Sequence, residues 1–160
     1  MNANKYLRIY LADHQAASVA GYELAKRTLG SKRGTRFEGD LVPVVEAIGE
    51  DKDKLVEMME ELGVSTNRFK CAGGWVLEKL ARAKLNGEIL NYSPLSRVVE
   101  FEGLVSGITA KRALWVSLRA ATADLGLDGA ELDHLIERAE TQSATMQRLR
   151  DEAATLAFSG

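Results

Sequence analysis

Apolar side chains recur every three or four residues along most of this chain, and this spacing predicts helices. Four long segments show the pattern, and a shorter one lies between the second and the third. The five predicted helices cover about residues 4–29, 37 or 40 to 62, 67–85, 94–123 and 129–157. No segment has the alternating pattern of a strand, so the chain is predicted to be all-α.

Several residues mark where the predicted helices begin and end. Gly30 and Gly63 are expected to end the first and second helices. Ser93-Pro94 is typical of an N-cap followed by the first helical residue. The stretch from Asp128 to Glu131 resembles a capping box with Asp at the N-cap. Pro43 is tolerated if the second helix starts with Asp40 as its N-cap, and should kink it if the helix starts near Phe37.

Four long amphipathic helices bury their apolar faces most simply by packing on one another. With 160 residues, the chain fits a single domain spanning 1–160. The short helix falls where ferritin-like folds place their long crossover connection. We therefore expect a ferritin-like up-down bundle of four long helices plus one short connecting helix.

Composition excludes several classes of function. The net charge of −2 gives no basic field, so we expect no nucleic-acid partner. No apolar run reaches the roughly 18 residues of a membrane span, so we expect no membrane partner. The single cysteine, Cys71, forms no internal disulfide, and the chain begins without a signal-peptide pattern. Both observations favour a cytoplasmic location.

Known catalytic motifs are missing from the sequence. It contains no phosphate loop, dinucleotide fingerprint, zinc spacing or nucleophile elbow, which favours a protein without catalytic activity. Trp75 and Trp115 have two interpretations, either in the core or at the interface of a homodimer. Pairs of small residues on the third and fourth helices allow close packing within or between subunits, and we expect a homo-oligomer, a dimer.

Three stretches of the chain resemble a family of small bacterial ferritin-like helical bundles associated with stress responses. They are residues 54–63, with the sequence KLVEMMEELG, the CAGG stretch at 71–74 followed by Glu78, and the amphipathic stretch 132–157. In that family they correspond to the end of the second helix, the connecting helix and the closing helix. The resemblance implies a ferritin-like fold and a stress-related role.

Ferritin-like oxidases bind two metal ions through carboxylates and two Glu-x-x-His motifs. This chain has two histidines, and only His134 follows a Glu by three residues. His134 is predicted to share the polar face of the last helix with Arg138, which argues against a ligand. Asp51 stands where the family pattern has a histidine on the second helix, and Phe101 occupies the corresponding position on the fourth. The chain is therefore interpreted as a degenerate member that lacks the di-iron histidines.

Four other residues are candidate ligands for one metal ion inside the bundle: His14, Asp51, Glu100 and Glu102. His14 is predicted at the core or its edge, and Asp51 interrupts the apolar stripe of the second helix. One imidazole and up to three carboxylates suit a hard cation such as iron or manganese. The other interpretation is a polar network, with Asp51 in a salt bridge and His14 hydrogen-bonded in the core.

The leading hypothesis is a non-catalytic ferritin-like protein without a cofactor, whose role is an interaction or a stress function. The second hypothesis is a degenerate metal–carboxylate protein that uses His14, Asp51, Glu100 and Glu102 to bind iron or manganese. A third is that a cavity inside the bundle binds a small organic ligand.

Overall fold

The computed structural model describes residues 4–65 and 93–159, and the part of the chain that it describes is helical with short connections. The helices are α1 (Lys5–Ser31), α2 (Glu38–Glu61), α4 (Pro94–Ala120), the single turn α5 (Thr122–Leu125) and α6 (Gly129–Phe158). Four long helices and a short one packed as a bundle confirm the predicted all-α architecture. The helix predicted for 67–85, together with Cys71 and Trp75, lies outside the described residues.

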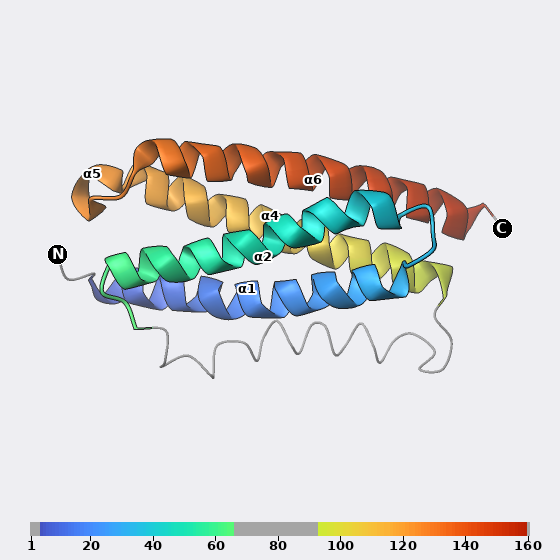
Figure 1. Cartoon of the computed structure of the whole chain (residues 1–160), viewed down its shortest axis with the longest axis horizontal. Helices are drawn as coiled ribbons and strands as arrows, with labels where there is room; N and C mark the ends of the chain where they lie inside the picture. Colours follow the sequence, from blue (N-terminus) through green and yellow to red (C-terminus); the bar gives the residue numbers. More distant parts are fainter. Residues whose placement is uncertain (1–3, 66–92, 160) are drawn as a thin grey trace.

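The four long helices lie side by side along one axis (Figure 1). α1 and α2 form one antiparallel pair, and α4 and α6 form the other. α1 also packs on α4, and α2 contacts α6. α2 and α4 run in the same direction, so the end of α2 and the start of α4 lie at opposite ends of the bundle (Figure 1).

Side-chain caps fix the starts of three helices, because each supplies an acceptor for a backbone N–H that has no partner within the helix. Asn4 accepts from the backbone of Leu7 (2.9 Å). Ser93 accepts from the backbone of Ser96 (3.2 Å), and Ser96 completes a capping box. Asp128 accepts from the backbone of Ala130 (2.9 Å). The predicted N-caps Ser93 and Asp128 are therefore confirmed.

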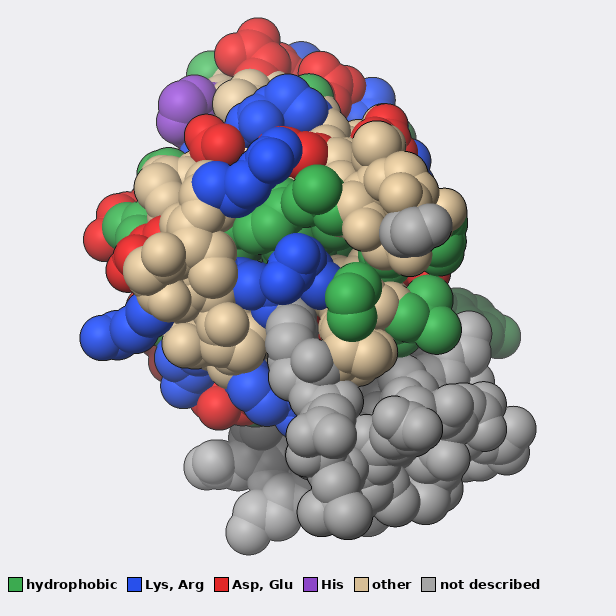
Figure 2. Space-filling view, turned by 90° about the vertical axis from the view of Figure 1, so that its right-hand side faces the viewer, with side chains coloured by type: hydrophobic (Ala, Val, Ile, Leu, Met, Phe, Trp, Pro, Cys, Tyr) green, Lys and Arg blue, Asp and Glu red, His purple; other side chains and the backbone are tan. Residues whose placement is uncertain are grey.

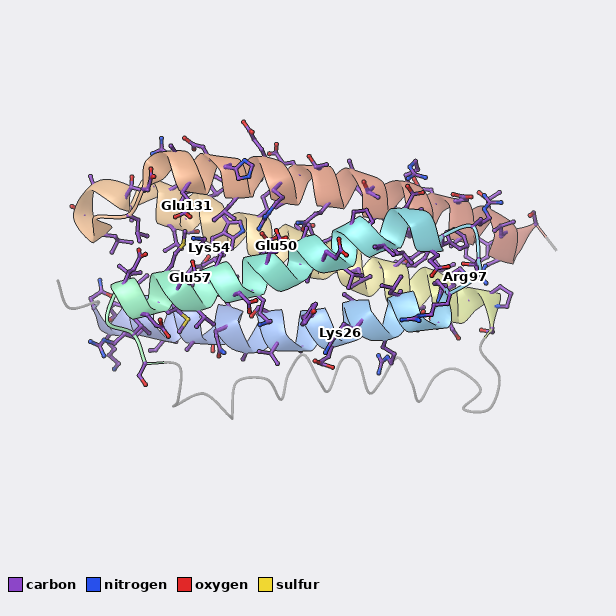
Figure 3. The ribbon with its side chains drawn as sticks, viewed as in Figure 1. Lys26, Glu50, Lys54, Glu57, Arg97 and Glu131 are labelled. Atoms are coloured by element: carbon purple, nitrogen blue, oxygen red, sulfur yellow. The ribbon has the colours of Figure 1, made fainter. Side chains whose placement is uncertain are left out.

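Glu131, predicted to complete a capping box with Asp128, instead pairs with another helix. Its carboxylate lies 2.7 Å from the ammonium of Lys54 on α2, which also pairs with Glu57 (Figure 3). The hydrogen bonds that Lys54 donates to Glu131 and, with the smaller effect, to Glu57 raise the pKa of Lys54. The pair therefore links α2 to α6 near the start of α6.

The connection between α1 and α2 differs from the prediction. Gly30 lies inside the last turn of α1, which ends at Ser31, and the residue with positive φ is Gly34 (72°). α2 begins at Glu38, so Pro43 lies inside the helix, where its ring nitrogen has no hydrogen to donate to the carbonyl of Gly39. Gly63, with φ 66°, follows Leu62, the C-cap of α2, as a helix-ending glycine should.

The core runs the length of the bundle and includes the predicted apolar stripe of α2. Trp115 has no exposed surface, which confirms its core interpretation, and the rings of Phe37 and Phe101 meet edge to face at 5.4 Å. None of the helices in residues 4–65 and 93–159 is long and apolar enough to cross a membrane. The buried side chains of α2 are Leu41, Val44, Val45, Ile48, Asp51, Leu55, Met58 and Met59.

Candidate functional site

Asp51 is the only charged member of the buried face of α2, and its side chain has no exposed surface. Its Oδ2 accepts a hydrogen bond from Nζ of Lys111 on α4 (2.5 Å) and another from Nε2 of Gln142 on α6 (3.0 Å). Its Oδ1 accepts from the guanidinium of Arg138, also on α6. Three helices therefore converge on one carboxylate, which we call the Asp51 network (Asp51, Lys111, Arg138 and Gln142).

Lys111 and Arg138 each donate a further hydrogen bond besides the one to Asp51. Nζ of Lys111 donates to Oε1 of Gln142 (2.5 Å), and Nη1 of Arg138 donates to Glu50 at the surface (2.8 Å). Burial lowers the pKa of Lys111, and the negative charge of Asp51 opposes this shift. Pairing offsets the desolvation of the carboxylate, which would otherwise be strongly unfavourable.

A cavity of about 260 Å³ lies between α1, α2 and α4, next to the Asp51 network. Most of its wall is apolar, and among the described residues three charged side chains reach it: Asp51, Lys52 and Lys111. The other lining residues in the part of the chain that the structure describes are His14, Ala17, Ser18, Gly21, Leu24, Ile48, Leu55, Gly103, Leu104, Ser106, Gly107, Ile108, Ala110, Leu114 and Trp115.

Small residues explain why this space is left open. Gly21 on α1 and Gly107 on α4 line the cavity, and a Cβ placed at either would meet no atom within 4 Å. At Gly103 the helices are closer, because a Cβ there would lie 3.1 Å from Cδ2 of Leu24. Gly107 and its neighbour Ser106 are exposed, so the cavity reaches the surface along α4.

Two aromatic side chains, His14 and Trp115, line the cavity. His14 is half-buried, packs edge to face on the ring of Tyr10 (4.6 Å), and has its pKa lowered by burial, with Asp13 opposing the shift. Trp115 is fully buried, and its indole Nε1 has no hydrogen-bond partner within the described part of the chain. An unpaired buried N–H is unusual and favours an acceptor placed beside it.

The four predicted metal ligands do not meet at one point. His14 and Asp51 line the same cavity, which agrees with the prediction that both face the bundle interior or its edge. Glu100 instead pairs with Lys32 (2.8 Å), and Glu102 is exposed. Among residues 4–65 and 93–159, no group of three or more His, Cys, Asp or Glu side chains is placed to hold a metal ion.

The position of Glu100 follows from helix geometry. It precedes Lys111 by 11 residues on α4, which is about 16 Å along a helix axis. Glu100 therefore lies near the α1–α2 connection, beside Lys32, whose side chain has no exposed surface. Figure 2 looks onto this end of the bundle, where Lys and Arg side chains lie among Asp and Glu side chains. Binding of iron or manganese by the four residues stays a prediction.

Sequence reasoning missed three members of the Asp51 network. The sequence predicts Arg138 on the polar face of the last helix, yet its side chain is only 25% exposed and reaches Asp51. For Lys111 and Gln142 the sequence does contain a signal, which is their spacing from apolar residues on the same helix. Lys111 lies between the buried Ile108 and Trp115, and Gln142 lies between the buried Ala139 and Met146. A polar residue on a buried face at helical spacing needs a partner, as Asp51 does.

No family model matches this chain, and no curated protein or solved structure is significantly similar to it.

Proposed function

We propose that this chain is a ferritin-like helical bundle without a di-metal centre, which acts through an interaction, in a stress-related role, rather than by catalysis. The order of the helices supports the architecture. α1 pairs with α2, α4 pairs with α6, and α2 and α4 run in the same direction (Figure 1). Ferritin-like folds have one long crossover of this kind in an otherwise up-down bundle.

The Asp51 network is the observation that carries the proposal. In ferritin-like metal proteins, inward-facing carboxylates and imidazoles hold two cations between the helices. Here Lys111 and Arg138 supply positive charge beside the buried carboxylate. Three hydrogen bonds occupy most of the roughly four acceptor positions that a carboxylate offers. A metal ion at Asp51 would have to displace cations that belong to the protein.

Elemental analysis of protein purified without chelators tests this proposal. We expect iron and manganese far below one ion per chain, both in the wild type and in Asp51→Asn. Asp53→Asn is the matched control, because Asp53 lies on the same helix with a 71% exposed side chain. Stoichiometric iron or manganese that disappears in Asp51→Asn and persists in Asp53→Asn would overturn the proposal and support the metal–carboxylate hypothesis.

The proposed interaction includes self-association as a homodimer. Because Trp115 is fully buried within one chain, it does not contribute to such an interface. Light scattering coupled to size-exclusion chromatography gives the mass in solution. A mass of one 17.5 kDa chain at all concentrations would contradict the dimer.

A further inference from the structure

We propose that the cavity between α1, α2 and α4 binds a small apolar molecule that carries one carboxylate. The apolar part would lie against the aliphatic wall, and the carboxylate would lie between the indole N–H of Trp115 and the ammonium of Lys111. This inference goes beyond the proposed function, which needs no ligand.

The size of the cavity sets the size of the ligand. Its volume is about 260 Å³. A cavity of about 150 Å³ lined by apolar side chains accepts benzene, so this one has room for on the order of ten non-hydrogen atoms. The wall from Leu24, Ile48 and Leu104 favours an aliphatic or aromatic body over a polar one. Exposed residues on α4, such as Ser106 and Gly107, provide the route of entry.

The indole N–H of Trp115 is the first reason to expect an acceptor on the ligand. The side chain is fully buried, lines the cavity, and has no hydrogen-bond partner among the residues described. A buried donor without an acceptor loses its hydrogen bond to water and gains nothing in return. A ligand oxygen would restore that bond once the side chains that cover the indole N–H shift to admit it.

Charge is the reason to expect a carboxylate rather than a neutral acceptor. Asp51, with no exposed side-chain surface, faces two cations, Lys111 and Arg138, whose side chains are 15% and 25% exposed. The balancing carboxylate, Glu50, lies at the surface with 66% of its side chain exposed. The buried part of the network is therefore net positive, and a second anion beside it would be stabilised.

Lys111 is the group that can reach such an anion. An ammonium has three hydrogens, and the bonds to Asp51 and Gln142 use two of them. Both Lys111 and Trp115 line the cavity on α4, one turn apart. A positively charged ligand would instead be repelled by Lys111. Asp51 would attract it only weakly, because the oxygens of Asp51 already accept three hydrogen bonds.

Calorimetric titration with octanoate, compared with octylamine of the same chain length, tests the inference below the concentrations at which either forms micelles. We expect octanoate to bind one per chain, and octylamine to bind at least tenfold more weakly. In spectra of ¹⁵N-labelled protein, octanoate should shift the indole N–H signal of Trp115, which is assigned as the signal missing from Trp115→Phe. Equal affinity for the two amphiphiles would overturn the inference.

Three variants locate the binding. Gly107→Leu places a side chain on the cavity wall where a Cβ meets no atom, and it should weaken octanoate binding at least tenfold. Gly30→Leu is its matched control, a helical glycine with equal space outside the cavity, and it should bind as the wild type does. Trp115→Phe keeps a ring and removes the donor, and it should weaken binding about tenfold. Unchanged affinity in Gly107→Leu would place octanoate elsewhere and overturn the inference.

Discussion

The carboxylate of Asp51 on α2 accepts a 2.5 Å hydrogen bond from the ammonium of Lys111 on α4, across 60 positions of sequence. Gln142 on α6 bonds to both partners, so the pair is held from a third helix. The centre of the bundle is therefore polar at the level of Asp51. The Asp51 network fixes how α2, α4 and α6 are aligned along the bundle axis, because a shift of one helix along that axis would leave Asp51 unpaired.

Replacing Asp51 with alanine should lower the free energy of unfolding by about 3–5 kcal/mol, because Lys111 and Arg138 would lose their buried counter-charge. Urea denaturation followed by circular dichroism measures the change. Asp53→Ala, at an exposed position, should change the stability by no more than about 0.5 kcal/mol.

The double variant Asp51→Leu/Lys111→Met separates charge from packing in the same network. Replacing a buried ion pair by apolar side chains of similar volume is often close to neutral. We therefore expect the double variant to be at least about 2 kcal/mol more stable than Asp51→Ala, with Arg138 still bound to Glu50. If it is as unstable as Asp51→Ala, the ion pair itself contributes net stability.

His14 should titrate below 6.5, because burial disfavours its charged form more strongly than Asp13 favours it. As the pH falls below 6.5, the unfolded chain therefore takes up a proton at this residue before the folded chain does. Stability should decrease with falling pH in that window, and His14→Gln should reduce the slope. NMR titration of the imidazole measures the pKa directly, with His134→Gln used to assign the two signals. A His14 pKa above 6.5 would contradict the prediction.

The two glycines near the α1–α2 connection should respond oppositely to alanine. Gly30 is helical with open space around it, so Gly30→Ala should stabilise the chain by up to about 1 kcal/mol. Gly34 has φ 72°, which strains an alanine, so Gly34→Ala should destabilise by roughly 1 kcal/mol. Thermal unfolding of both variants gives the comparison, and a stabilised Gly34→Ala would contradict the helix end observed here.

Loss of the N-cap of α4 should be measurable on its own. Ser93→Ala removes the acceptor of the capping box and should destabilise by about 1 kcal/mol. Thr109→Ala is the control on the same helix, since its hydroxyl bonds only to the carbonyl of Val105, and it should change the stability by less than about 0.5 kcal/mol. Equal effects in urea denaturation would show that the cap contributes nothing specific.

Sequence predicted the features that depend on neighbours in the chain. The long helices, the N-caps Ser93 and Asp128 and the buried position of Asp51 all follow from local spacing and cap chemistry. The prediction that Gly30 ends the first helix is wrong, because a helix tolerates a glycine in its last turn. The left-handed residue that follows the helix lies at Gly34 instead.

The partners of Asp51 depend on how far each helix is displaced along the bundle, which spacing within one helix does not encode. The sequence predicts Glu100 in one cluster with Asp51, yet Glu100 lies three turns of α4 away from Lys111 and pairs with Lys32. Arg138 was placed on the polar face because it borders that face, and its long side chain reaches inward from there. These pairings depend on how far α1, α2, α4 and α6 are displaced along the bundle relative to one another.

Lys32 follows α1 directly, and its ammonium bonds to Glu100 while its side chain has no exposed surface. Amine-reactive reagents modify only lysines that solvent reaches, so this residue is protected as long as the end of the bundle stays closed. Its rate of acetylation by an external reagent, followed by peptide mass spectrometry, would therefore report the rate at which the α1–α2 connection separates from α4. Lys26, with a 46% exposed side chain on the same helix, gives the unprotected rate for comparison.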